Sequence, residues 1–329
     1  STYTVSVVLN RAAYVSPELT KRVLDAVREL DYTVNDLARS LQTRKTRTIG
    51  MLIPDIASPF YAKVVRGVED VLKEAGYSLI LGNTYNQAEE QARYLTVFRS
   101  KQADGLLLFL CPGGEADVEH ALKNRKPIVF VGRTPANLDA DSVSADNVKG
   151  TQMAVEHLIR KGHRRVALIT GQADLSTSAD RVTGWKKALR RAKLSAPSSL
   201  VAEGDWTEDG GYRATMGFLE QTPPPTAIFA SNFLMMTGAL RAIKEKGLRC
   251  PQDVEVMSSD DSEWLDVFEP RISTVLQPSY TMGAKAAELL LKRIASPGRR
   301  PERIVLEPEL KCEIDAGEHR VPIRRARRV

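Results

Sequence analysis

The sequence predicts an α/β protein with two doubly wound parallel-sheet lobes, preceded by a short helical segment. From residue 48 onward, short apolar runs alternate with amphipathic helical stretches, as in parallel sheets with crossover helices. The stretch 48–55 is weakly repeated at 165–172, and similar alternation follows each copy, which indicates two lobes. A chain of 329 residues is long enough for two or three domains.

Hydrophobic periodicity locates the elements of the two lobes. The expected strands are 49–53, 78–81, 105–110, 128–131, 166–170, 227–230 and 254–257. The expected helices are 59–75, 89–101, 150–161, 181–192 and 234–246. Ligands of such sheets bind beyond the carboxyl ends of the strands, so a binding site is expected in a cleft between the lobes.

The first 45 residues have a helical pattern. Ser16, Pro17 and Glu18 form a helix start, with a capping hydroxyl, proline at the first position and an acid near the positive end of the dipole. Apolar residues then recur at helical spacing up to Leu30. Asn35 caps a second short helix, expected over 36–43.

The positive charge is concentrated at the two ends of the chain. The net charge is +6, residues 1–47 hold eight Lys and Arg against five Asp and Glu, and residues 318–329 hold five Arg against one Glu. The nearly neutral middle suits a protein that meets phosphates at one end and a small molecule elsewhere. The Arg-rich residues 318–329 could instead be a solvated terminus that meets no phosphates.

Enzyme signatures are missing from the sequence. It contains no phosphate-binding glycine loop, no His-Glu-x-x-His and no Gly-x-Ser-x-Gly. Its four His and three widely spaced Cys form no metal-ligand or disulfide pattern. We therefore expect no enzyme activity, no cofactor and no metal. No apolar run is long enough for a membrane span, and no signal peptide is visible, so a cytoplasmic protein is expected.

Several segments, in their order and spacing, resemble the lactose-repressor (LacI/GalR) family along nearly the whole chain. They are 1–10, 15–18, 35–43, 48–61, 145–147, 162–165, 181–185, 204–206, 225–232 and 273–278. The resemblance implies five parts: a partial helix-turn-helix DNA-binding head (1–34), a hinge helix and linker (35–47), an N-terminal lobe (48–146 plus about 278–298), a C-terminal lobe (147–277 plus about 299–317) and a basic tail (318–329). The family pattern has a further helix of about fifteen residues before Ser1, so the head is matched only in part.

The resemblance implies two sets of DNA contacts. A recognition helix carries short polar side chains that reach base edges in the major groove, and a hinge leucine wedges into the minor groove. The residues at these positions are Thr2, Tyr3, Ser6 and Val7 in the head and Ala38, Arg39, Leu41 and Gln42 in the hinge. Val7 can offer only apolar contact, and its alternative role is helix packing.

The resemblance also implies an effector site between the lobes. Arginine can make forked bonds to hydroxyls or a carboxylate, Asp accepts from paired hydroxyls, and Trp stacks on a sugar ring. This set fits a polyol better than an apolar ligand, although the charged members could instead form interlobe salt bridges. The implied effector residues are Phe60, Tyr61, Arg133, Asp146, Arg181, Trp206, Asn232 and Asp260.

The expected function is a repressor that binds a pseudo-palindromic operator as a homodimer or tetramer and responds to a sugar-like effector. Two rivals share the predicted core: a periplasmic-type sugar-binding protein, which would lack head and hinge, and a two-domain enzyme, which would need a catalytic constellation. Phe233 and the pair Ser258-Ser259 depart from the family pattern near the pocket floor, so the family's ligands do not carry over.

Overall fold

The computed structural model describes residues 4–5, 7–8, 13–30, 45–123, 126–133, 138–260, 262, 265 and 271–312. The chain divides into two units, Ser1–Thr46 and Arg47–Val329. The expected hinge helix at 36–43 and the basic tail at 318–329 lie outside the described residues.

The first unit contains the helix that the sequence predicts after Ser16. Helix α2 spans Pro17–Glu29, and the Ser16 hydroxyl accepts a hydrogen bond from the Leu19 N–H. Val7 is only 7% exposed, whereas Val5 and Val8 are half-buried. The burial of Val7 favours the packing alternative over a base contact at that position.

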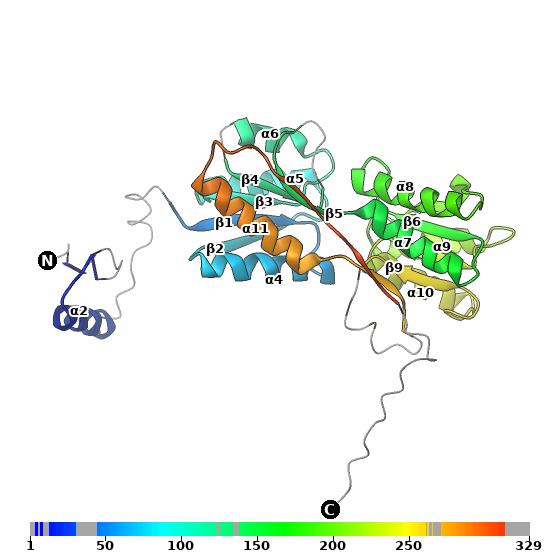
Figure 1. The fold of residues 1–329 in the computed structure, drawn as a ribbon, viewed down its shortest axis with the longest axis horizontal. Helices are drawn as coiled ribbons and strands as arrows, with labels where there is room; N and C mark the ends of the chain where they lie inside the picture. The colour runs from blue at the N-terminus through cyan, green and yellow to red at the C-terminus, as the bar shows by residue number, and fades with distance from the viewer. Residues whose placement is uncertain are drawn as a thin grey trace, which may run out of the picture. The chain divides into compact units, whose positions relative to one another are not determined.

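The first lobe is a six-stranded parallel sheet with the order β11-β5-β4-β3-β1-β2. Its strands are β1 (Thr48–Ile53), β2 (Ser78–Asn83), β3 (Gly105–Leu108), β4 (Ile128–Val131), β5 (Asp141–Ala145) and β11 (Arg303–Leu306). Its helices are α4 (Pro59–Glu74), α5 (Ala88–Ser100), α6 (Glu115–Lys123) and α11 (Ser279–Ala295). Figure 1 shows α11 beside α4 on one side of this sheet.

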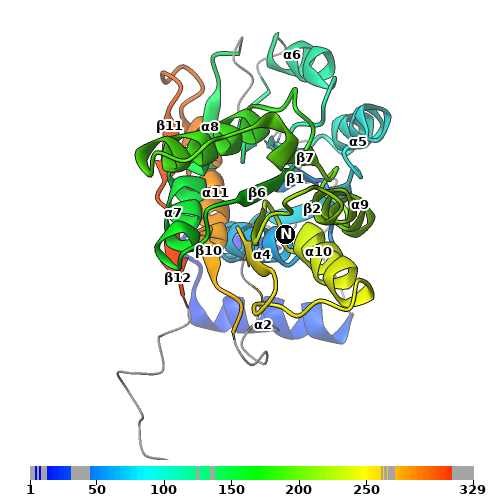
Figure 2. The same cartoon turned by 90° about the vertical axis from the view of Figure 1, so that its right-hand side faces the viewer.

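The second lobe repeats this plan with the strand order β12-β10-β9-β8-β6-β7. Its strands are β6 (Val166–Thr170), β7 (Val201–Glu203), β8 (Ala227–Ala230), β9 (Glu255–Ser258), β10 (Thr274–Leu276) and β12 (Glu309–Lys311). Its helices are α7 (Asn147–Arg160), α8 (Ser176–Arg191), the 3-10 helix η1 (Ser198–Leu200), α9 (Glu208–Leu219) and α10 (Phe233–Glu245). All neighbouring strands are parallel except β12, which runs antiparallel to β10. Figure 2, turned by 90°, shows α9 beside α10 and α7 beside α8.

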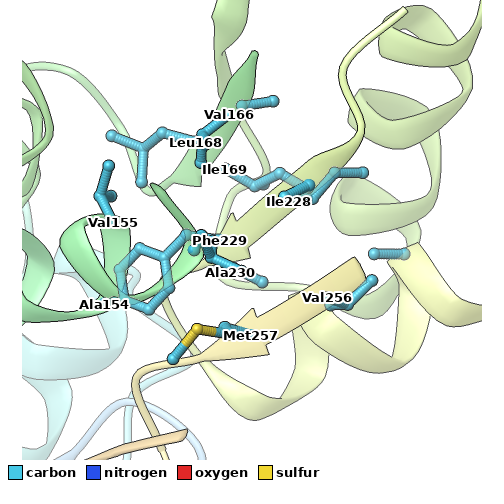
Figure 3. Close-up of a cluster of buried hydrophobic side chains, with 14 of the residues drawn as sticks. Ala154, Val155, Val166, Leu168, Ile169, Ile228, Phe229, Ala230, Val256 and Met257 are labelled. Carbon is cyan, nitrogen blue, oxygen red and sulfur yellow. The ribbon is translucent and has the colours of Figure 1, made fainter. Parts of the chain in front are cut away.

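Both sheets are covered by helices on two faces, so their central strands are buried throughout. In the second lobe, Leu168, Phe229 and Met257 from three neighbouring strands meet Ala154 and Val155 of α7 (Figure 3). These rigid sheets hold the carboxyl ends of their strands in place and thereby fix where the loops after those strands begin.

The chain passes between the lobes three times. It leaves the first sheet after β5 and enters α7, returns between β10 and α11, and crosses again between β11 and β12. The expected assignment of 299–317 to the second lobe is therefore wrong for β11, which pairs with β5 of the first sheet. Only β12 joins the second sheet, because Glu307 and Pro308 carry the chain across.

Candidate functional site

A cavity of about 90 Å³ lies between the lobes at the carboxyl ends of strands from both sheets. It is lined by Pro54, Ser58, Phe60, Tyr61, Asn86, Phe109, Leu110, Gly132, Arg133, Ala145, Asn147, Leu175, Thr177, Arg181, Trp206, Ser231, Asn232, Asp260, Gln277 and Met282. Seven of the eight effector residues expected from the sequence are in this set; Asp146 is not.

An aromatic cluster forms the wall of the first lobe. Phe60 and Tyr61 open helix α4, and Phe109 follows β3. The ring of Tyr61 meets those of Phe60 and Phe109 edge-on, with centroids 5.1 and 4.9 Å apart. Burial, and to a lesser extent the nearby Asp260, raises the pKa of the Tyr61 hydroxyl, so this group is neutral at physiological pH. The wall is apolar, with one hydroxyl that can donate or accept.

Two guanidinium groups, one from each lobe, reach the cavity. Arg181 on α8 is 6% exposed, and its guanidinium lies 5.0 Å from the centre of the Trp206 ring, a cation–π distance. Arg133 follows β4 and is half-buried. Burial lowers the pKa of both side chains, but arginine remains charged at physiological pH. Among the described residues, neither guanidinium has a hydrogen-bond acceptor, so both keep donors for a ligand.

Asp260 follows β9 and is the acidic group of the cavity. It is 5% exposed, and its carboxylate accepts hydrogen bonds from the Phe233 N–H at 3.3 Å and from Gln277 Nε2 at 3.0 Å. Burial raises the pKa of the Asp260 carboxyl to about 6, although the positive charge of Arg181 and the two hydrogen bonds oppose this shift.

Asn232 lines the cavity but uses both atoms of its amide within the protein. Its Oδ1 accepts from the Met235 N–H at 2.8 Å and so caps helix α10. Its Nδ2 donates to the Trp206 carbonyl at 3.0 Å. Asp205 and Trp206 both have left-handed backbone, with φ of 50° and 64°. Asn232 thus positions the Trp206 loop, and each amide atom has one further hydrogen-bonding site beyond the bond it makes within the protein.

Asp146 also serves as a helix cap. Its carboxylate accepts from the Lys149 N–H at 2.8 Å at the start of α7, while the next residue, Asn147, lines the cavity. The carboxylate of Asp146 therefore caps the helix that opens the second lobe and does not line the cavity.

Of the cavity residues that were not expected from the sequence, three polar ones are Asn86, Ser231 and Gln277. Each follows the carboxyl end of a strand, which is the one signal that could have indicated them. Ser231 is fully buried, and its hydroxyl has no hydrogen-bond partner among the described groups.

The DNA-binding residues expected from the sequence are not brought together by the described structure. Thr2, Tyr3, Ser6, Ala38, Arg39, Leu41 and Gln42 lie outside the described residues. Within the described part of the chain, no cluster of acidic, His or Cys side chains could hold a metal ion. The same part holds no helix with the length and hydropathy of a membrane span.

Comparison with known protein families gives two matches. Residues 1–35 match the family described as bacterial regulatory proteins, lacI family. Residues 155–312 match a periplasmic binding protein-like domain.

The curated relatives are repressors. A ribose operon repressor of Haemophilus influenzae is 37% identical over 94% of this chain and 92% of its own length. A transcriptional repressor of Escherichia coli O139:H28, PurR, is 36% identical over the same shares.

Solved structures of repressors share the fold. The lac repressor dimer bound to operator and an anti-inducer aligns with a TM-score of 0.82 and 27% identity, over 95% of this chain and 94% of its own. A complex of the transcriptional regulator CelR with cellobiose aligns with a TM-score of 0.72 and 33% identity, over 93% of each chain.

Proposed function

Because the chain belongs to the LacI family of bacterial transcriptional regulators, we propose that it is a repressor whose operator affinity is set by a sugar-like effector held between its lobes. It is a DNA-binding regulator controlled by a small molecule, and its relatives are repressors rather than enzymes. The match of residues 1–35 to a regulatory head disfavours the rival, a periplasmic-type sugar-binding protein without DNA function.

The observation that carries the effector proposal is the cavity between the lobes. It combines two arginines without acceptors, a buried carboxylate and the aromatic face of Trp206. Sugars present this mixture of hydroxyl groups and apolar ring faces, so the cavity suits them better than a wholly apolar ligand.

On the DNA side, the proposal assigns base contacts to Thr2, Tyr3 and Ser6, with Val7 beside them as an apolar or packing residue. Ala38, Arg39, Leu41 and Gln42 are proposed to enter the minor groove from a paired hinge. A homodimer is the smallest assembly that matches a pseudo-palindromic operator, and a tetramer would join two such dimers. On this proposal the protein acts in the bacterial cytoplasm.

Control of DNA binding requires that the effector prefer one of two lobe arrangements. A ligand that binds both arrangements equally shifts neither. We propose that effector in the cleft alters the angle between the lobes and thereby the spacing of the two hinge helices over the operator.

The effector half of the proposal can be tested by the fluorescence of Trp206. Titration with neutral sugars, sugar acids, sugar phosphates and purines should give a saturable change with one class. A Trp206→Phe variant should lose the signal while calorimetry still detects binding, and Arg181→Ala should lose both. Saturation by a purine alone would contradict a sugar-like effector.

The DNA half requires a separate measurement. A pool of random pseudo-palindromic duplexes is selected against the protein, and the recovered duplex is labelled for fluorescence anisotropy. Addition of the effector at saturation should change the dissociation constant at least tenfold, which corresponds to a coupling of about 1.4 kcal/mol. If the selection enriches no duplex, the proposed binding of a pseudo-palindromic operator is contradicted.

A further inference from the structure

We propose that the effector is a sugar acid, a polyhydroxy compound with a single carboxylate, and that Arg133 and Arg181 bind this carboxylate. The inference rests on the proposed function, because it narrows the ligand class of the same cleft. Four features of the cavity support it: its charge, its unpaired donors, its helix ends and its acceptors for hydroxyl groups.

The lining of the cavity has one positive charge in excess. Its only ionisable groups with a charge near neutral pH are Arg133, Arg181 and Asp260. Other acids influence the two arginines from outside the lining. The half-buried Glu115 and the exposed Asp174 act on Arg133, and the exposed Asp180 acts on Arg181; solvent screens the two aspartates. A ligand with one negative charge balances the lining, a neutral sugar leaves it positive, and a phosphate dianion makes it negative.

The unpaired donors are the second feature. Arg181 is more than nine-tenths buried, and its guanidinium has no acceptor among the described residues. A buried charge without a hydrogen-bonded partner is costly, and a carboxylate matches the fork geometry of a guanidinium. The buried Ser231 hydroxyl, also without a partner, lines the same cavity.

The third feature is a pair of helix N-termini, one from each lobe. Helix α4 begins after Ser58 and helix α8 after Leu175, and both of these residues line the cavity. Neither N-terminus has a side-chain cap, whereas α7 and α10 are capped by Asp146 and Asn232. Uncapped first-turn N–H groups and the positive end of the helix dipole favour an anion.

The cavity also holds acceptors for hydroxyl groups. Asp260 and Gln277 form a hydrogen-bonded pair in its lining, and the carboxylate of Asp260 repels a second carboxylate and accepts from hydroxyls. The guanidinium of Arg181 lies over the Trp206 ring, 5.0 Å from its centre. A sugar acid would therefore bind with its carboxylate on the guanidinium groups and a hydroxyl group on Asp260.

The test is isothermal titration calorimetry of the full chain at pH 7.5. The probes are the five- and six-carbon aldonates and uronates, their neutral parent sugars, and glucose 6-phosphate and ribose 5-phosphate. One sugar acid should bind roughly 10- to 100-fold more tightly than its neutral parent, as expected for hydrogen bonds to a charged group.

Variants assign the preference to the arginines. Arg133→Gln should reduce the ratio of acid to parent affinity to within a few-fold. Arg133→Lys, which keeps the charge but loses the fork, should restore part of it. Arg249→Gln is the matched control, because Arg249 is an exposed residue paired with Asp253 outside the cavity. The Arg249→Gln variant should have the same ratio of acid to parent affinity as the wild type. Circular dichroism checks that each variant is folded.

Each outcome decides between the two proposals. If a neutral sugar binds as tightly as its acid, the proposal of a sugar-acid effector is wrong, but the proposal of a sugar-like effector is not contradicted. If a sugar phosphate binds most tightly, the proposal that the effector carries a single carboxylate is also wrong. Binding of no member of the panel by the folded chain overturns both.

Discussion

Asp260 makes the stability of the protein depend on pH. Burial raises the pKa of its carboxyl to about 6 from the ordinary 3.8, so the folded protein binds this proton more tightly than the unfolded chain does. Its contribution to the free energy of unfolding is fully present below about pH 4 and is lost as the pH rises through 6.

We therefore expect the wild type to gain about 1 kcal/mol in free energy of unfolding between pH 7.5 and pH 5, relative to Asp260→Asn. Urea titrations of both proteins at the two pH values measure this difference. The Asp260→Asn variant is the control for the wild type, because it lacks the Asp260 carboxyl and keeps every other titrating group. Parallel pH profiles would show that Asp260 does not titrate in this range.

Asn232 both caps helix α10 and holds the Trp206 carbonyl, and two variants of this residue can separate the two roles. Asn232→Ala removes both the cap of α10 and the donor to the Trp206 carbonyl, and should lower the free energy of unfolding by about 1–2 kcal/mol. Asn232→Ser keeps a capping hydroxyl and loses only the amide donor.

The serine variant should recover most of the stability in a urea titration, while both variants shift the Trp206 emission and weaken effector binding. Full recovery of effector affinity by serine would mean that the amide donor to the Trp206 carbonyl has no role in the site.

Roles of single residues were only partly predictable from the sequence. Arg181 and Asp260 could be expected in the cleft because they stand at positions that the resemblance to the LacI family assigns to the effector site. Asn232 and Asp146 could not be distinguished from ligands, because Asn and Asp are at once good polar ligands and preferred helix caps. Only the hydrogen bonds in the structure separate these two roles.

Two glycines let helices α4 and α11 approach closely. A Cβ built on Gly283 would lie 2.0 Å from the Val64 carbonyl oxygen, and one on Gly67 would lie 2.2 Å from that of Tyr280. These atoms are backbone, so the helices themselves would have to move apart.

Gly283→Ala should therefore lower the free energy of unfolding by about 1–3 kcal/mol, as overpacking does. Gly217 in α9 is the control, because a Cβ there meets nothing within 4 Å. Gly217→Ala should leave stability unchanged or raise it by up to about 1 kcal/mol. Thermal unfolding of both variants decides the matter; equal effects would contradict a close helix contact.

Most elements with a strong apolar pattern were predicted, but helices α6, α9 and α11 were not, although α11 buries an apolar stripe. All seven expected strands are present, with ends shifted by up to two residues. Strand β5 was missed because its sequence, Asp-Ser-Val-Ser-Ala, is largely polar. Strands β7, β10 and β12 have three residues each, too few to show a period. Helix α8 begins five residues before the expected 181, since its first turn is polar and shows no apolar period.

The narrow cleft implies that the lobes move when an effector binds. Pockets for small ligands usually enclose about 300–1,000 Å³, well above the 90 Å³ here. We expect saturating effector to change the radius of gyration in small-angle X-ray scattering, with Arg181→Ala, which does not bind, as the control. Superimposable curves with and without bound effector would contradict a change in lobe angle.

The division into lobes could be predicted from the internal repeat, but not the destination of the last strands. Residues 303–311 contain two short strands separated by Glu307 and Pro308. Which sheet each strand joins depends on how the lobes lie beside each other, and a local pattern does not carry that information.

The third passage between the lobes has a consequence for synthesis of the protein. β11 covers the edge of β5 in one sheet, and β12 covers the edge of β10 in the other. Until the ribosome has released these last strands, a nascent chain presents an open strand edge on both lobes at once, the feature that invites pairing with other chains. Neither lobe can complete its sheet before residues 303–311 have left the ribosome, so the two sheets are completed together.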